Sequence, residues 1–167
     1  NPKLEYETLG TEEILLAVSP SHPLSAGFPD LHHIEDSYPR ITWDKLEGEN
    51  LILHFPEQTT GAITERLLAK HHIHPRVPFY TRNTQAALLL VQENQGICFA
   101  PETYIRSMTF QKPPVCFSLG DEEAFTATTL AYRKGAYLSP YSLDFIQKEK
   151  KYFNNYTNNN VGGTCND

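Results

Sequence analysis

A helix followed by a short buried strand is predicted for residues 84–101, and this stretch limits the possible folds more than any other. Residues 85–92 are apolar almost all the way round a helix that Thr84 can cap, which favours burial between other layers. Asn94 and Gly96 are typical of a helix end, and the apolar run at 97–100 is typical of a parallel strand covered on both faces. Helix and strand together form half of a βαβ unit, in which ligands bind at the carboxyl ends of strands and the amino ends of helices.

The segments upstream continue the same alternation. Strands are predicted at 50–55 and 76–81, with an amphipathic helix at 62–71 between them. This order predicts an α/β domain with a mostly parallel sheet flanked by helices. Further strands are predicted at 3–8, 14–18, 115–119 and 125–132, with a bend near Leu9 and Gly10, and a last helix opens at Ser139 and Pro140.

Composition excludes several classes of protein. The formal net charge of -6 and the pI near 5.6 argue against this segment holding a DNA duplex or an anionic membrane, since either needs a basic face. No apolar run approaches the roughly 20 residues that cross a bilayer. Three widely spaced cysteines, Cys98, Cys116 and Cys165, indicate buried free thiols in a reducing compartment rather than a disulfide framework. Residues 154–167 are rich in Asn and Gly, which predicts a flexible tail.

Polar residues gather at the two predicted strand-to-helix junctions. A helix amino end that offers hydroxyls and free backbone N–H groups binds carboxylate, sulfate or phosphate. If both junctions open on the same side of the sheet, together they suit a small anion. The alternative is that the threonines are plain helix caps. The candidate ligand-binding residues are Gln58, Thr59 and Thr60 at the first junction and Asn83, Thr84 and Gln85 at the second.

Metal binding and catalysis find little support in the sequence. The histidines at 71–74 and at 32–33 lack the carboxylate and the spacing of a known metal site, so neither a metal nor another cofactor is expected. The chain has no G-x-S-x-G motif, no P-loop and no Cys–His pair with a supporting acid, so no catalytic residue is proposed. Arg82 and Arg106 could clamp an acid, although an exposed salt bridge is the default for each.

Five segments, in order and spacing, resemble the effector-binding domain of LysR-type transcriptional regulators. The resemblance implies two α/β subdomains of the type 2 periplasmic-binding-protein kind, joined by two crossover strands, with a small effector in the cleft between them. In some members a Thr at the position of Thr60 touches the effector. The segments are HPL at 22–24, ITWDKL at 41–46, TGAITERLLAKHHIHPRV at 60–77, residues 84–101, and AYRKGAYLSPYSLDFI at 131–146.

The resemblance also implies a division of the chain. Residues 9–115 would form a complete second subdomain, whereas 1–8 and 116–153 would form the crossover strands and a remnant of the first subdomain. The opening part of the first subdomain and the family's winged helix-turn-helix do not occur in the chain. Strands 115–119 and 125–132 would then have unpaired edges and an uncovered apolar face.

The sequence therefore predicts the effector-sensing part of a LysR-type regulator. Such a domain would be cytoplasmic, non-catalytic and homo-oligomeric, and it would bind a small anionic metabolite. It would reach DNA only through a winged helix-turn-helix absent from this chain, and it would not contact a membrane. Two alternatives remain open: a solute-binding protein of a transport system on the same fold, and an enzyme on a doubly wound sheet.

Overall fold

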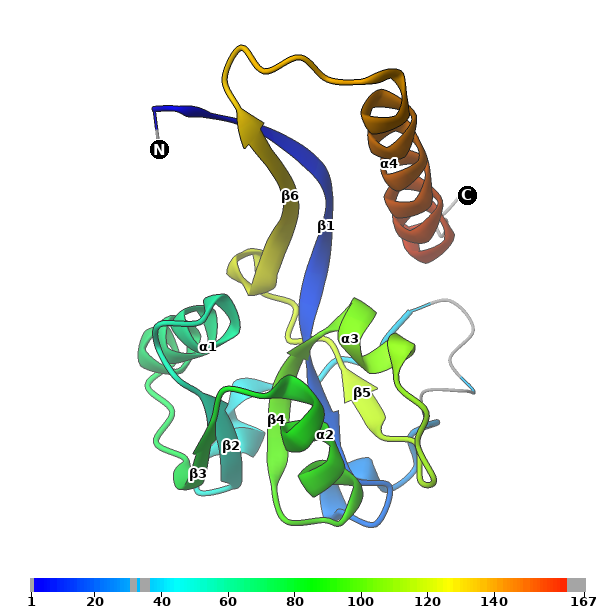
Figure 1. Ribbon diagram of the computed structural model, residues 1–167. Helices are drawn as coiled ribbons and strands as arrows, with labels where there is room; N and C mark the ends of the chain where they lie inside the picture. Colours follow the sequence, from blue (N-terminus) through cyan, green and yellow to red (C-terminus); the bar gives the residue numbers. More distant parts are fainter. Residues whose placement is uncertain (1, 31–32, 34–36, 162–167) are drawn as a thin grey trace, which may run out of the picture. The chain divides into compact units, whose positions relative to one another are not determined.

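The computed structural model describes residues 2–30, 33 and 37–161 (Figure 1). The strands are β1 (Leu4–Val18), β2 (Asn50–His54), β3 (Arg76–Thr81), β4 (Ile97–Pro101), β5 (Val115–Phe117) and β6 (Phe125–Arg133). The α-helices are α1 (Thr59–Lys70), α2 (Thr84–Gln92), α3 (Glu102–Ser107) and α4 (Pro140–Val161), and the 3₁₀ turns include η1 (Pro23–Ser25), η3 (Trp43–Leu46) and η4 (Glu122–Ala124).

The chain forms two compact units. The larger is Glu13–Thr126, and the smaller combines the residues up to Glu12 with those from Ala127 onward. Strands β1 and β6 each run from one unit into the other. The two units therefore meet at 12/13 and 126/127, while the expected subdomain division at 8/9 and 115/116 stays a prediction.

The sheet is mixed. Its strand order is β3-β2-β4-β1-β5, and β6 also pairs with β1. Strand β2 is parallel to both β3 and β4, whereas β1 is antiparallel to β4 and to β5. The predicted α/β class is confirmed, and the parallel pairs among the described strands include β2 with β3 and β2 with β4.

Side chains alternate between the two faces of the sheet, and each face has its own core. Each fully buried Leu, Ile or Phe side chain contributes about 1.5–3 kcal/mol to folding. The face under α1 is built on Ile14, Leu16, Val18, Leu51, Leu53, Ile97 and Phe99, against Ile63, Leu67 and Leu68 of the helix. The face under α2 and α3 is built on Leu15, Ala17, Ile52, Cys98 and Ala100, against Ala87, Leu88, Val91 and Ile105. Strand β4 is therefore covered on both faces, as predicted (Figure 1).

Helix α2 is less buried than its composition predicts. Ala87, Leu88 and Val91 are fully buried against the sheet, but Leu89 is 45% exposed. The expectation of burial between two layers is wrong, because α2 covers only one face of the sheet and no described element covers its outer side.

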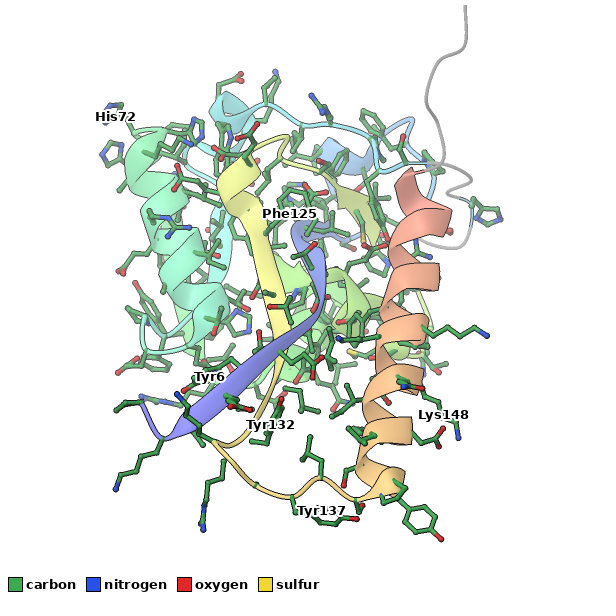
Figure 2. All side chains as sticks on the ribbon, turned by 90° about the horizontal axis from the view of Figure 1, so that it is seen from above. Tyr6, His72, Phe125, Tyr132, Tyr137 and Lys148 are labelled. Carbon is green, nitrogen blue, oxygen red and sulfur yellow. The ribbon has the colours of Figure 1, made fainter. Side chains whose placement is uncertain are left out.

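Helices α1 and α2 end in the same hydrogen-bonded motif. After α2, Asn94 has a positive φ of 54°, and the Gln95 N–H donates to the Leu90 carbonyl at 3.0 Å. After α1, His72 has a φ of 56°, and the Ile73 N–H donates to the Leu68 carbonyl at 2.9 Å (Figure 2). Both are Schellman ends, which satisfy the last carbonyls of a helix. The predicted stop after residue 92 is confirmed.

Strand β1 is continuous from Leu4 to Val18, so the expectation of two separate strand segments is wrong. Its partners are distant in sequence: β4 and β5 pair with residues 14–18, and β6 pairs with β1 as well. Strands β5 and β6 both pair with β1, and the pairing of β5 is antiparallel. Strand β5 is the last in the strand order, in agreement with the unpaired edge expected for residues 115–119.

The smaller unit contains the first part of β1, most of β6, and α4. The Ser139 hydroxyl accepts a hydrogen bond from the Ser142 N–H at 3.2 Å, which confirms it as the cap of α4. The helix continues to Val161, beyond the point at which the flexible tail is predicted to begin. Aromatic side chains of this unit face solvent, with Tyr137 87% and Tyr141 86% exposed (Figure 2).

Two of the three cysteines are buried free thiols, as predicted: Cys98 and Cys116. Both pair with Ala17 of β1, from opposite sides. Two strand spacings of about 4.8 Å separate their backbones, which is too far for a disulfide. The third, Cys165, lies outside the described residues.

Gly61 provides a test of how α1 docks on the end of β2. A Cβ at this position would lie 2.1 Å from the Phe55 carbonyl oxygen and 2.7 Å from the His54 oxygen. Although Gly→Ala usually stabilises a helix by about 1 kcal/mol, we expect Gly61→Ala to destabilise the chain by roughly 2 kcal/mol or more, since backbone atoms would have to move. Urea unfolding measures the change. Gly48→Ala is the matched control: its positive φ of 73° adds strain but its Cβ meets nothing within 4 Å, so an equal loss in both variants would contradict the prediction.

Candidate functional site

The two predicted junctions lie at the same edge of the sheet. Strands β2 and β3 are parallel, and their last residues, His54 and Thr81, are register partners. The chain therefore leaves both strands at the same level to enter α1 and α2. The two strands that lead into these helices are neighbours in the sheet, and each helix amino end has partly unsatisfied N–H groups and the positive end of a dipole.

Gln58 connects the first junction to the second. Its Nε2 donates to the carbonyl oxygen of Arg82 at 3.0 Å. Its Oε1 is buried and has no hydrogen-bond partner among the described residues. Gln58 is also the N-cap residue of α1, but its side chain makes no capping bond. The amino end of α1 therefore lacks a side-chain cap.

Thr59 and Thr60 belong to the first turn of α1. The expectation that one of them caps the helix is wrong, because the backbone is already helical at Thr59. Thr59 is exposed, whereas Thr60 is only 9% exposed. A ligand at this edge would therefore reach the Thr59 hydroxyl more readily than that of Thr60.

At the second junction, Asn83 is the helix cap. Its Oδ1 accepts from the Ala86 N–H at 3.1 Å, so the assignment of the cap to Thr84 is wrong by one residue. The Thr84 Oγ1 instead lies 3.1 Å from His54 Nε2, which joins the start of α2 to the end of β2. Gln85 is exposed and lines a separate groove of about 450 Å³ with Leu89, Tyr104, Ser107, Met108 and Thr109.

His54 is a site residue that the sequence analysis missed. It is 4% exposed, and burial lowers the pKa of its imidazole. The neutral ring then fixes the position of the Thr84 hydroxyl. The sequence does contain a signal for this role, because a single His follows the apolar run 51–53 immediately before the junction.

Arg82 places a positive charge between the two helix ends. Its guanidinium carbon lies 3.9 Å from the centre of the Phe55 ring, a cation–π contact. Its nearest described carboxylate oxygen is Glu57 Oε1 at 3.7 Å, and both side chains are mostly exposed. An exposed pair at that distance contributes about 0–1 kcal/mol, so the guanidinium can exchange Glu57 for an anionic ligand.

The histidine clusters do not form a metal site in the described part of the chain. No three His, Cys, Asp or Glu side chains there gather around a common point. His71 bonds to Asp121 at 2.8 Å, and the His74 N–H donates to Glu47 at 2.8 Å. His32 lies outside the described residues. Arg106 makes the expected salt bridge, with Glu102 at 2.9 Å.

The His54–Thr84 contact predicts a pH dependence of stability. Because the folded-state pKa of His54 is lowered, its contribution to the free energy of unfolding is complete above about pH 6.5 and is lost as the pH falls towards the folded pKa. Urea unfolding between pH 8 and pH 5 should therefore show a larger loss for the wild type than for His54→Gln. Thr84→Ser keeps the hydroxyl and should follow the wild type. Equal pH slopes for the wild type and His54→Gln would contradict the assignment.

Comparison with known proteins identifies the family. The LysR substrate binding domain profile matches residues 1–151. A sequence search of curated proteins finds no match. No described helix is both long enough and apolar enough to span a membrane.

Solved structures share the fold at low sequence identity. The CcmR regulatory domain of Synechocystis PCC6803, in complex with 2-PG, has a TM-score of 0.72 and 16% identity, over 92% of this chain and 68% of that one. The effector-binding domain of QuiR with shikimate has a TM-score of 0.66 and 20% identity, over 93% and 68%. The effector-binding domain of BenM with benzoate has a TM-score of 0.67 and 22% identity, over 94% and 66%. The chain belongs to the LysR substrate-binding domain family.

Proposed function

We propose that this chain senses a small anionic effector at the sheet edge where α1 and α2 begin. The observation that carries the proposal is the alignment of two helix amino ends at one edge, linked by the Gln58–Arg82 hydrogen bond. Both ends favour negative charge, and the Arg82 guanidinium adds a full positive charge between them. This local field opposes the net charge of -6 of the whole chain.

The six candidate residues would contribute to binding in different ways. Thr59, Asn83 and the first N–H groups of α1 and α2 would hydrogen-bond the anion directly. Gln58 and Thr84 would position the two junctions through their bonds to Arg82 and His54. Thr60 is buried, so its contribution would need a small opening of the first turn. Gln85, which lines another groove, would offer its backbone N–H rather than its side chain.

Family membership supports effector sensing over the alternatives. The similar structures bind 2-PG, shikimate and benzoate, and the last two are carboxylates. We propose that the chain likewise binds its ligand without transforming it. An effector of this kind regulates only if it binds one conformation better than another, since equal affinity shifts no equilibrium.

The whole protein is proposed to be a transcription regulator. This chain spans 48% of full-length BenM, which it resembles with a TM-score of 0.64 and 21% identity. On that basis the larger unit would be the second effector-binding subdomain, and the smaller unit would be part of the first. DNA would be contacted by a separate winged helix-turn-helix domain in a cytoplasmic homo-oligomer.

Thermal shift tests the anion proposal directly. Benzoate, shikimate, 2-PG and inorganic phosphate are titrated against the chain, with benzamide as the uncharged counterpart of benzoate. At a ligand concentration of 100 Kd, about 2.7 kcal/mol of stabilisation is expected, which raises Tm by several degrees. Arg82→Gln should remove most of the shift, and Thr59→Val should weaken it.

Arg133→Gln is the matched control, since Arg133 is an exposed arginine of β6 that belongs to the smaller unit and to neither junction. It should leave the ligand-induced shift unchanged. An anion that stabilises Arg82→Gln as much as the wild type, or benzamide acting as strongly as benzoate, would overturn the proposed site.

A further inference from the structure

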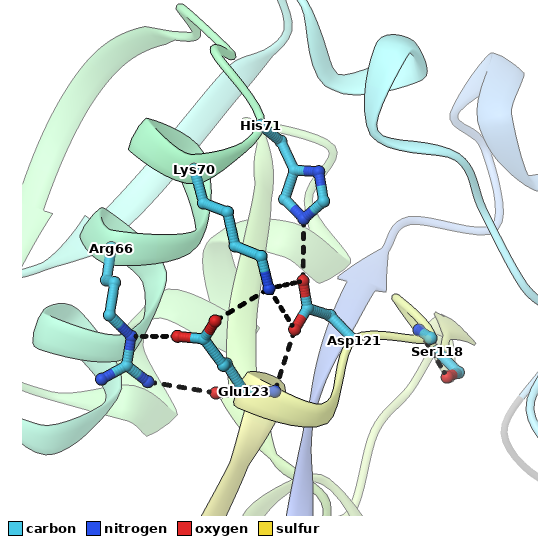
Figure 3. A network of polar contacts seen from close by, with 7 residues as sticks. Arg66, Lys70, His71, Ser118, Asp121 and Glu123 are labelled. Atoms are coloured by element: carbon cyan, nitrogen blue, oxygen red, sulfur yellow. Dashed lines mark hydrogen bonds and ion pairs between the residues drawn. The ribbon is translucent and has the colours of Figure 1, made fainter.

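Residues 118–123 follow β5 and include the first two residues of the 3₁₀ turn η4, which leads into β6. We call them the 118–123 segment. It lies in the larger unit, next to the points at which both β1 and β6 leave that unit. Two sets of polar contacts hold it. One is to the C-terminal end of α1 (Figure 3), and the other is to β1.

The contacts with α1 centre on two carboxylates. Asp121 lies 3.0 Å from Lys70 Nζ and 2.8 Å from His71 Nε2. Glu123 lies 2.8 Å from the same Lys70 nitrogen and 2.9 Å from Arg66 Nε (Figure 3). The Asp121 side chain is only 8% exposed, which shields its two bonds from water better than those of an ordinary surface pair. The network therefore joins the last turns of α1 to the segment at several points.

Other groups reinforce the position of Asp121. The hydrogen bond from His71, the Glu123 N–H and the Lys70 ammonium hold the pKa of its carboxyl well below the usual range. The His71 ring also stacks on Trp43, with centroids 4.3 Å apart and planes 9° apart. Trp43 in turn packs near Phe99 of the core, at 6.4 Å. The carboxylate is thus tied through His71 to the rigid part of the unit.

The contacts with β1 lie at the other end of the segment. The Ser118 hydroxyl donates to Glu13 Oε1 at 2.6 Å, and the Gly120 N–H donates to Ser118 Oγ at 3.1 Å. Glu13 is the first residue of the larger unit on β1. The Ser118 backbone bonds in addition to Pro39 and Ile41, at 2.9 and 3.2 Å. The 118–123 segment therefore contacts β1 at the residue where β1 enters the larger unit. The same segment comes just before β6, the strand that leaves this unit.

We propose that the 118–123 segment is a polar clamp that fixes both connecting strands to the C-terminal end of α1. Helix α1 is a rod of about 18 Å, at 1.5 Å per residue, with the proposed effector edge at its other end. A ligand that displaces the amino end of α1 then displaces the clamp and both strands with it. The regulatory meaning of the clamp rests on the proposed function, but the clamp itself does not require a ligand.

Hydrogen exchange of the ligand-free chain, followed by mass spectrometry, tests the clamp. Asp121→Asn removes the charge but keeps an oxygen for the Glu123 N–H, which now bonds to Asp121 at 2.9 Å. We expect the amides of Phe125 and Thr126 to exchange roughly tenfold faster, the change that about 1.4 kcal/mol of local stability produces. Ser118→Ala should have a similar effect on the amides of β1 around Glu13. The amides of β2 and β4 should be unchanged in both variants.

Asp144→Asn is the matched control, because it breaks an exposed ion pair of α4, with Lys148 at 2.7 Å, outside the clamp. It should leave exchange near Phe125 and Glu13 unaltered. Wild-type exchange at those amides in both clamp variants would overturn the proposal, as would faster exchange spread equally over β2 and β4. Since no ligand is present, these outcomes are independent of whether anions stabilise the chain.

Discussion

The parallel pairing of β2 with β3 and β4 is the constraint on which the rest of the structure depends. It aligns His54 with Thr81, so two chain segments leave the sheet at one level and start their helices together. The His54–Thr84 and Gln58–Arg82 hydrogen bonds then lock the two helix starts to each other. Gly61 lets α1 begin in contact with the β2 carbonyls, which a side chain would prevent. The position of the proposed site is thus set by the backbone pairing, and the side chains then fix the two helix starts.

Much of this architecture could be predicted because its signals are local. The apolar run at 97–100, the helix end at Asn94 and the alternation of strands and helices each depend on a few neighbouring residues, and the structure agrees with them. The failures have a different origin. Continuity of β1 depends on partners about 80 to 100 residues away in the chain, such as Phe99 and Phe117 opposite Leu16, and no local pattern records them. The exposure of Leu89 depends on which side of α2 faces the sheet. A helix that is apolar on all sides does not indicate which side that is.

The candidate site shows the same division. Residue types at both junctions were sufficient to predict that helix amino ends would lie there, since Gln-Thr-Thr-Gly and Asn-Thr-Gln follow strands. The roles within each junction were not predictable. Asn83 rather than Thr84 is the cap, because the backbone becomes helical one residue earlier than expected. His54 and Arg82 acquire their roles only from neighbours across the sheet. Sequence identities of 16–22% with the similar structures show a shared fold but do not show that these side-chain contacts are shared. The contacts are therefore inferred from this chain alone.

Binding of a small anion where α1 and α2 begin can be measured through amide chemical shifts. In a ¹⁵N-labelled chain titrated with benzoate, shikimate and phosphate, we expect the largest shift changes at the amides of Thr59, Thr60, Thr84 and Gln85. Saturation should follow the same curve at both junctions, because one ligand touches both. Changes confined to the groove around Tyr104 and Met108, or changes at one junction alone, would rule out the proposed site.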